Sequence, residues 1–252
     1  SKPRCPVLID SGGFAALFKD TELVEDDGLG ILRFPDSEEQ NELCPATVLD
    51  FQEGHADLAF TLDFPVPPNT DDEEAERRME LTKANAIWAI QNRRKRDMPL
   101  FAALQGNEPD DYRRMAESLS QYPFNGFAIG GLVPRIRNWE FVKATISSVI
   151  EVVAPRPVHV FGIGKPETVS RLFKLGVDSV DSSSFVKLAA DGQSWAGSNS
   201  IEDPATTDRL LLALTNLAEA VRLTPYGQKQ LALVREPALE YKSGPFLSRV
   251  IS

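Results

Sequence analysis

Three aspartates in this 252-residue sequence each stand directly after a short apolar segment. Asp10 follows residues 6–9, Asp63 follows residues 58–62, and Asp181 follows residues 177–180. A carboxylate at the C-terminal end of a buried strand points into the mouth of an α/β fold, where catalytic residues usually lie. Carboxylates gathered there can transfer protons or attack a sugar carbon. In the alternative interpretation, Asp10 and Asp181 only cap neighbouring turns or helices.

Other apolar segments end on an amide or on glycines. Residues 99–105 end on Gln105, residues 126–129 are followed by Gly130-Gly131, and residues 158–161 are followed by Gly162 and Gly164. Together with the three carboxylates, these groups suit a purine-like heterocycle. A carboxylate accepts from a ring N–H and an exocyclic amine, whereas an amide and a backbone N–H donate to a carbonyl. Phe14 and Phe64 are candidates for stacking on the flat ring. In the plainer alternative, the Gln105 amide only forms hydrogen bonds with a loop, and Gly130-Gly131 only forms a tight turn.

The elements that carry these residues alternate between strands and helices. Strands are predicted over residues 6–10, 58–63, 99–105, 126–129, 158–161 and 177–180. Helices are predicted over residues 45–54, 71–96, 110–121, 141–153, 167–175 and 208–222, with a hairpin strand at 29–34 and a loop over 192–207. Such alternation favours a parallel α/β sheet, either a barrel or a doubly wound fold, and the length fits one α/β barrel.

Composition narrows the functional classes. The net charge is −10, and 42% of the residues are hydrophobic. No apolar run is long enough to span a membrane and no secretory signal is visible, so we expect a cytoplasmic protein. Cys5 and Cys44 stand apart from any Cys/His cluster, which predicts free thiols, no structural metal and no cofactor.

A protein that grips a nucleic-acid backbone normally presents basic residues. Here they occur in short runs, at residues 93–96, 113–114 and 135–137. The first run could be part of a nucleic-acid surface or, in the plainer reading, the solvated end of a helix. Nucleic acid, either DNA or RNA, therefore stays a candidate partner.

Six motifs resemble, in order and spacing, the tRNA-guanine transglycosylase (queuine/archaeosine tRNA-ribosyltransferase) family. They are Asp10-Ser-Gly-Gly-Phe14, Leu62-Asp63, Ala103-Leu-Gln-Gly106, Gly126-Phe-Ala-Ile-Gly-Gly-Leu132, Phe161-Gly-Ile-Gly164 with Pro166-Glu167, and Gly176-Val-Asp-Ser-Val-Asp181. The match runs from about residue 7 to residue 192. Single motifs of this kind are weak signals, but six in the correct order are specific.

The resemblance implies a TIM-like (β/α) barrel and a reaction that replaces guanine in a polynucleotide with a 7-deazaguanine through a covalent ribosyl–aspartate intermediate. By motif match, Asp181 falls on the nucleophile and Asp10 on the general acid/base. Asp63 falls on the carboxylate that reads the base. Seven further matches place Gln105 and Gly131 on the base carbonyl, Phe14 on the stacking aromatic, and Ser11, Gly130, Leu132 and Gly164 among the substrate-binding residues.

The sequence also departs from the family pattern. The family's three-cysteine-plus-histidine zinc element, expected after Asp181, is absent, and residues 182–185 lead to Asp191-Gly192 and a loop. The family's barrel has further strands before the one that holds Asp10, so we expect a barrel that is incomplete at its N-terminal side, or one that is completed by the C-terminal segment or by another chain. The predicted organisation is one transglycosylase-like domain over residues 1–252, with a core at 6–192 and a helical extension at 200–252. An open sheet edge favours a homodimer or a partner subunit.

Three hypotheses for function follow. The first is a base-exchanging transglycosylase that uses guanine and a 7-deazaguanine such as preQ0 on DNA or another non-tRNA target. The second is a subunit that binds a 7-deazaguanine or a nucleotide for a modification or anti-phage defence complex. The third is an unrelated barrel hydrolase that cleaves an N-glycosidic bond with water as the acceptor.

Overall fold

The protein is described from a computed structural model. The structure describes residues 6–35, 42–195 and 208–225. The chain forms two compact units, one made of Ser1–Gly164 with Arg171–Ser183 and the other of Lys165–Ser170 with Ser184–Ser252. The expectation of a single domain with a core at residues 6–192 stays a prediction.

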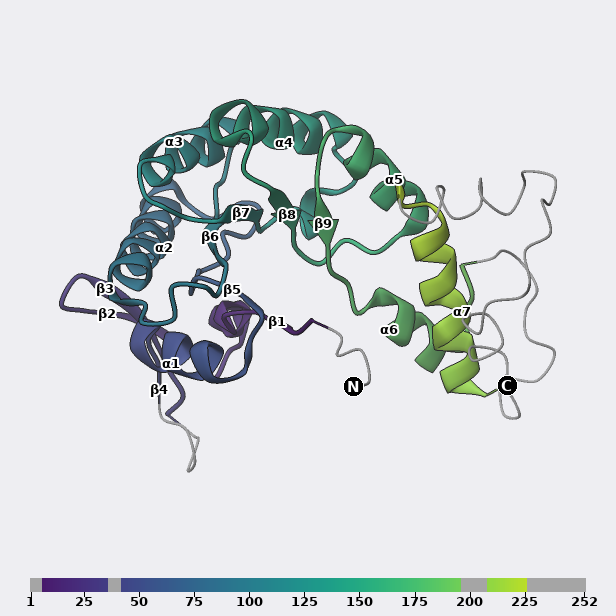
Figure 1. Ribbon diagram of the computed structural model, residues 1–252, viewed down its shortest axis with the longest axis horizontal. Helices are drawn as coiled ribbons and strands as arrows, with labels where there is room; N and C mark the ends of the chain where they lie inside the picture. The colour runs from purple at the N-terminus through teal and green to yellow at the C-terminus, as the bar shows by residue number, and fades with distance from the viewer. Residues whose placement is uncertain (1–5, 36–41, 196–207, 226–252) are drawn as a thin grey trace. The chain divides into compact units, whose positions relative to one another are not determined.

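The first unit contains a six-stranded sheet in which every neighbouring pair is parallel. Its strands follow chain order across the sheet: β1 (Leu8–Ile9), β5 (Leu58–Phe60), β6 (Leu100–Leu104), β7 (Gly126–Ile129), β8 (Val158–Val160) and β9 (Ser179–Val180). The sheet curls as part of a barrel (Figure 1). Within the described residues β1 and β9 are its two edges. This confirms the predicted TIM-like barrel that is incomplete.

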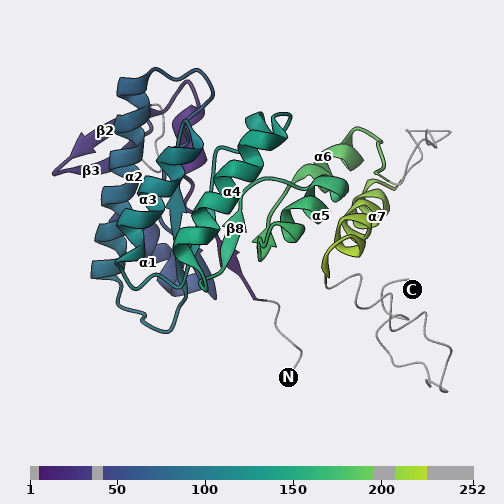
Figure 2. The same ribbon diagram turned by 90° about the horizontal axis from the view of Figure 1, so that it is seen from above.

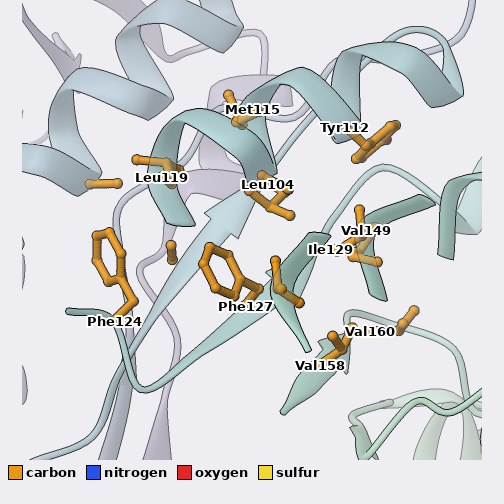
Figure 3. Packing of buried hydrophobic residues seen from close by; sticks show 14 of the residues in the cluster. Leu104, Tyr112, Met115, Leu119, Phe124, Phe127, Ile129, Val149, Val158 and Val160 are labelled. Atoms are coloured by element: carbon orange, nitrogen blue, oxygen red, sulfur yellow. The ribbon is translucent and has the colours of Figure 1, made fainter. Parts of the chain in front are cut away.

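Three helices cover the outer face of the central strands, namely α2 (Asp72–Asn92), α3 (Pro109–Ser120) and α4 (Trp139–Val153). They lie side by side in Figure 2. Strands β6, β7 and β8 are buried along their whole length, which explains their nearly continuous apolar sequence. Figure 3 shows the packing, with Phe127 and Ile129 of β7 close to Leu104, Met115 and Val149. Each fully buried side chain of this size contributes about 1.5–3 kcal/mol of transfer free energy.

Two shorter helices belong to the connections between strands. Helix α1 (Pro45–His55) precedes β5 and packs against α2, and α5 (Pro166–Lys174) precedes β9. Two 3-10 helices lie after β1 and β7, namely η1 (Gly13–Leu17) and η2 (Val133–Arg135). Both follow strand ends that carry predicted site residues, so the loops of the site are short and partly helical.

A small antiparallel sheet precedes α1 and is formed by β2 (Glu22–Asp26), β3 (Leu29–Arg33) and β4 (Glu42–Leu43). Asp27 and Gly28 both have positive φ, which is the backbone of the tight hairpin turn predicted there. Strand β3 lies against α2 (Figure 2). The α2 residue Asn85 donates to the Gly30 carbonyl at 3.0 Å and accepts from the Gly30 N–H at 2.9 Å.

Phe64 belongs to the core beneath this small sheet. It is fully buried with Leu32 and Leu81, and a Cβ at Gly30 would stand 2.1 Å from its ring. The prediction that Phe64 stacks on a ligand is therefore wrong. The residue follows Asp63 directly, and neighbouring side chains in extended backbone point to opposite sides.

The second unit contains two packed helices, α6 (Ser184–Ala190) and α7 (Arg209–Arg222). Their contact is formed by Phe185, Ala189, Leu212 and Ala213. The predicted helix over residues 208–222 is confirmed as α7, and the Asp208 carboxylate caps it by accepting from the N–H groups of Leu210 and Leu211. Helix α6 was missed, because the residues after Asp181 were expected to lead to a loop. Residues 196–207 of the predicted loop lie outside the described residues. No helix in the described part of the chain is both long and apolar enough to cross a membrane.

We predict that Asn85→Ala lowers the free energy of unfolding by about 2–3 kcal/mol, because the buried N–H and carbonyl of Gly30 both lose their partner. Asn92→Ala on the same helix is the matched control, since Asn92 is exposed and donates only to the Trp88 carbonyl. Urea unfolding of both variants measures the difference. An equal loss of unfolding free energy in both variants would show that the hydrogen bonds between Asn85 and Gly30 do not stabilise the fold.

Candidate active site

The predicted site residues all follow the C-terminal ends of strands in the parallel sheet. Asp10 comes after β1, Asp63 after β5, Gln105 after β6, Gly130 after β7, Gly162 after β8 and Asp181 after β9. Because the strands are parallel and neighbours in sequence order, their C-terminal ends all lie on the same side of the sheet. The fold therefore brings the three carboxylates to the C-terminal ends of the strands, on one side of the sheet.

Asp63 is the most buried of these carboxylates, with 6% of its surface exposed. One carboxylate oxygen accepts from the Ser11 hydroxyl at 3.0 Å and the other accepts from the Gln105 side-chain amide at 2.6 Å. These two bonds connect the ends of β1, β5 and β6. Three residues that the motifs singled out are thus joined into one hydrogen-bonded group.

Burial raises the pKa of Asp63, and the neighbouring charge of Asp10 raises it further. The hydrogen bonds from Gln105 and Ser11 act in the opposite direction, and the result is a pKa of about 7. Asp63 consequently changes between neutral and ionised forms near neutral pH. Shifts of this kind cluster at functional sites.

The glycines of the first motif allow a close approach to Asp63. A Cβ at Gly13 would stand 1.8 Å from the Asp63 carbonyl oxygen, so no other residue fits there. Gly12 has φ of 79°, a conformation that other residues rarely adopt. The Ser11 hydroxyl also accepts from the Gly13 N–H at 3.2 Å. The residues between Asp10 and Phe14 are therefore packed directly onto the buried carboxylate.

Gln105 and the glycines after β7 are packed just as closely. A Cβ at Gly130 would stand 2.1 Å from the Gln105 side-chain nitrogen. The buried Oε1 of Gln105 has no hydrogen-bond partner within the described residues. A buried acceptor without a partner is costly, and a donor on a bound ligand would satisfy it.

Two buried side chains that the sequence reasoning missed hold this glycine loop. The Tyr112 hydroxyl of α3 donates to the Gly130 carbonyl at 3.0 Å, and burial raises the pKa of Tyr112. The Arg135 guanidinium donates to the carbonyls of Gly131 and Val66, both at 2.9 Å. Arg135 was considered only as part of a basic surface. Its burial behind the loop gives it a different role, because it fixes the carbonyl side of Gly131.

Asp10 is exposed to solvent, and its carboxylate accepts from the Ser11 N–H at 2.7 Å. Desolvation by the surrounding protein raises its pKa, the Ser11 bond lowers it, and the charge of Asp181 raises it again, for a net upward shift. A third missed residue, Gln52 of α1, holds the backbone here. Its buried amide donates to the carbonyls of Asp10 and Phe60, at the ends of β1 and β5.

Asp181 differs from the other two carboxylates because its side chain is 58% exposed. One of its oxygens, Oδ1, accepts from the Gly162 N–H at 2.9 Å and bonds His159 Nε2 at 3.2 Å. Partial burial by itself raises the pKa of Asp181, but these two hydrogen bonds outweigh it and leave the pKa lowered. His159 is a fourth missed residue. Its only signal in the sequence is a lone polar residue within an apolar strand.

The remaining predicted residues are placed as follows. Phe14 lies on η1, is 61% exposed, and meets the edge of Phe18 at a centroid distance of 5.8 Å. The side chain of Leu132 is fully buried in the main core, so its backbone is the part available to a ligand. Gly164 is buried and lies two residues beyond Gly162 in the loop after β8.

Several arginines of the basic runs are paired with nearby acids. Arg94 bonds Glu53 at 3.0 Å and also bonds Asp50, while Arg113 bonds Glu117 and Glu151. Arg93 is largely buried and donates to Asn125. The charges of Arg94 and Arg113 are therefore partly neutralised by their own surroundings.

A family model described as "Queuine tRNA-ribosyltransferase" matches residues 2–217. The tRNA-guanine(15) transglycosylase of Methanothermobacter thermautotrophicus is 30% identical over 191 residues, which cover 74% of this chain and 26% of that protein. The protein of the same name from Pyrococcus abyssi is 34% identical over 139 residues, covering 54% of this chain and 23% of its own length.

The tRNA-guanine(15) transglycosylase of Methanopyrus kandleri is 31% identical over 138 residues, or 53% of this chain and 30% of that protein. The chain thus spans less than a third of the length of these relatives. The family inferred from the six motifs is confirmed, and the match includes every strand end described above. This chain belongs to the queuine tRNA-ribosyltransferase family.

Proposed function

We propose that this chain carries the base-exchange site of a transglycosylase that replaces guanine in a nucleic acid with a 7-deazaguanine of the preQ0 type. The observation that carries the proposal is the placement of three carboxylates of different character at one sheet edge. Asp181 has a lowered pKa, Asp10 a raised one, and Asp63 a pKa of about 7. Environments that push the pKa values of neighbouring acids apart are typical of acid, base and nucleophile assignments.

Asp63 and Gln105 are proposed to read the flat edge of the base. An ionised Asp63 accepts from the ring N–H and the exocyclic amine, while the Gln105 amide and the Gly131 N–H donate to the base carbonyl. A carboxylate offers about four acceptor positions, and Ser11 and Gln105 use one on each oxygen. Ser11 would orient Asp63, and the backbone of Gly130, Leu132 and Gly164 would line the site. Phe14 is exposed at the entrance and suits stacking on the ring.

The proposed chemistry consists of two displacements at the anomeric carbon of the sugar. A carboxylate oxygen of Asp181 bonds that carbon, and the glycosidic bond to guanine breaks with its electron pair leaving on the base nitrogen. Asp10 gives its proton to that nitrogen and later takes the proton from the incoming base. The incoming nitrogen then bonds the carbon and Asp181 leaves. Two inversions give net retention, as in glycosidases that use a covalent intermediate.

The acceptor is proposed to be DNA or another target besides tRNA, although the relatives' names specify tRNA. The net charge of −10 and the pairing of Arg94 and Arg113 with acids support a weak grip on a nucleic-acid backbone by this chain alone. A second copy or a partner subunit would then supply further contacts. Incubation with labelled guanine or preQ0 and either tRNA or DNA distinguishes the acceptors.

A second candidate function is a subunit that binds a 7-deazaguanine for another enzyme. It is favoured by the fact that Ser11, Asp63 and Gln105 are joined by hydrogen bonds within this chain. This group could bind a base even if Asp181 does not act as a nucleophile. Calorimetry that shows binding of the free base, with no incorporation of label unless a partner is added, would support this candidate over the first.

We predict that Asp181→Asn lowers incorporation of labelled base by about 1000-fold or more, because an amide cannot form the ester with the sugar. Binding of the free base should change little, since Asp63 and Gln105 are untouched. The measurement is label incorporation together with mass spectrometry of the trapped protein–nucleic-acid adduct. Asp110→Asn, which changes an exposed acid on α3, is the control. An active Asp181→Asn enzyme would exclude the covalent mechanism.

We predict that binding of the free base weakens as the pH falls through about 7, by about tenfold between pH 8 and pH 6. The sign follows from the raised pKa of Asp63. The ionised form, which dominates above pH 7, accepts from the base, whereas the protonated form replaces one acceptor with a donor. Calorimetry with guanine across this range gives the profile. Asp63→Asn should bind weakly at every pH, and an unchanged profile in this variant would assign the titration to another group.

A further inference from the structure

His159 is buried on β8, and each of its two ring nitrogens makes a hydrogen bond. It is 2% exposed, although the carboxylate that it contacts is largely exposed. Nε2 lies 3.2 Å from Asp181 Oδ1, and Nδ1 lies 2.8 Å from the hydroxyl of Ser179. Ser179 and Asp181 are two residues apart, so they point to the same side of the chain at β9. The imidazole therefore bridges two side chains of the neighbouring strand.

The partners of the ring determine its tautomer. An ionised carboxylate only accepts hydrogen bonds, so the proton must be on Nε2. Nδ1 of the neutral ring is then an acceptor, and the Ser179 hydroxyl can donate to it. If the ring becomes a cation, Nδ1 donates to the same hydroxyl oxygen. In either state His159 donates to Asp181, and the Ser179 hydroxyl satisfies Nδ1.

Aromatic side chains hold the plane of the imidazole. The rings of Phe60 and Phe161 both lie 4.9 Å from it, centroid to centroid. Phe60 and Phe161 also contact each other, and Phe60 packs on the buried Phe101. A ring enclosed in this way cannot swing away from Asp181 without moving core side chains. The donor is consequently held in place before any ligand arrives.

We propose that His159 is a positioning residue for the nucleophile: with the Gly162 N–H it holds Oδ1 of Asp181 and so presents Oδ2 to the sugar carbon. This inference rests on the proposed role of Asp181 as the nucleophile. The same two bonds stabilise the carboxylate when it leaves in the second displacement, because a hydrogen-bonded carboxylate is the better leaving group. No such role was assigned to His159 from the family resemblance.

Three acids determine the pH behaviour of this arrangement. Asp181 contacts the ring directly, Asp10 at the end of β1 interacts electrostatically with both His159 and Asp181, and Asp63 interacts in turn with Asp10. Loss of the imidazole removes one of the hydrogen bonds that lower the pKa of Asp181. The pKa of Asp181 must then rise, and the acid limb of the reaction must move to higher pH.

The test compares His159→Phe with His159→Gln. Phenylalanine fits the aromatic surroundings but donates nothing, whereas the terminal amide of glutamine can place an N–H near the position of Nε2. We expect His159→Phe to slow formation of the Asp181 adduct by about 100-fold, the loss typical of a misplaced reacting group. His159→Gln should recover most of this loss. Binding of free guanine should be unchanged in both variants, because the base is read elsewhere.

A second measurement does not depend on activity. Carbon NMR of the labelled Asp181 carboxylate should give a higher pKa in His159→Phe than in the wild type, and an intermediate value in His159→Gln. Ser179→Ala, which leaves the aromatic cluster untouched, should shift the same pKa upward by a smaller amount. His55→Phe, at the only other histidine of the chain, is the matched control and should change neither quantity. Thermal unfolding confirms that each variant is folded.

The outcomes separate two failures. If the wild type forms no adduct but the pKa shift appears in His159→Phe, the proposed function is wrong and the hydrogen bond is still present. If the wild type is active and His159→Phe matches it in both rate and pKa, the positioning role is wrong. Equal losses in His159→Phe and His159→Gln would reduce His159 to a packing residue and would also overturn the inference.

Discussion

The rest of the site depends on the hydrogen bonds that the buried Asp63 carboxylate accepts. Its bonds to Ser11 and Gln105 tie together the ends of three strands, and the buried position would be unfavourable for a charge without them. The compensation is incomplete, because burial still leaves its pKa at about 7 and the Oε1 of Gln105 has no partner in the described residues. A site with such an unpaired acceptor and such a raised pKa suits a ligand that brings its own donors and acceptors.

Two of the motif glycines are explained by close packing against Asp63 and Gln105, whereas others have the positive φ of tight turns. Gly13 lies against the Asp63 backbone and Gly130 against the Gln105 side chain, at separations that leave no room for a Cβ. The loops after β1 and β7 are therefore part of the packing around the two polar groups. Substitution of either glycine would push apart the groups that are proposed to hold the base, even though neither glycine has a side chain to offer.

Much of the fold could be predicted from the sequence, because parallel strands buried on both faces give apolar runs and because residues after such runs share one edge. The hydrogen bonds between side chains of different strands could not be predicted in this way. Nothing in the sequence shows that Gln105 bonds Asp63 or that Arg135 lies behind Gly131, since these contacts depend on side-chain packing across strands. His159 was missed because one histidine in a three-residue strand resembles any buried residue. Phe64 was misplaced because its side of the backbone is set by the small sheet that it packs on.

The three acids show how one sheet edge can hold groups with separate chemical tendencies. Asp63, after the inner strand β5, is surrounded by protein and its pKa is raised, whereas Asp181, after the edge strand β9, has more solvent and two donors, and its pKa is lowered. Asp10 lies between these extremes and interacts electrostatically with both. Ionisation of any one acid therefore changes the proton affinity of the next. A proton on Asp10 relieves repulsion with both of these neighbours, which supports the proposed role of Asp10 as the group that carries the exchangeable proton while Asp181 stays charged.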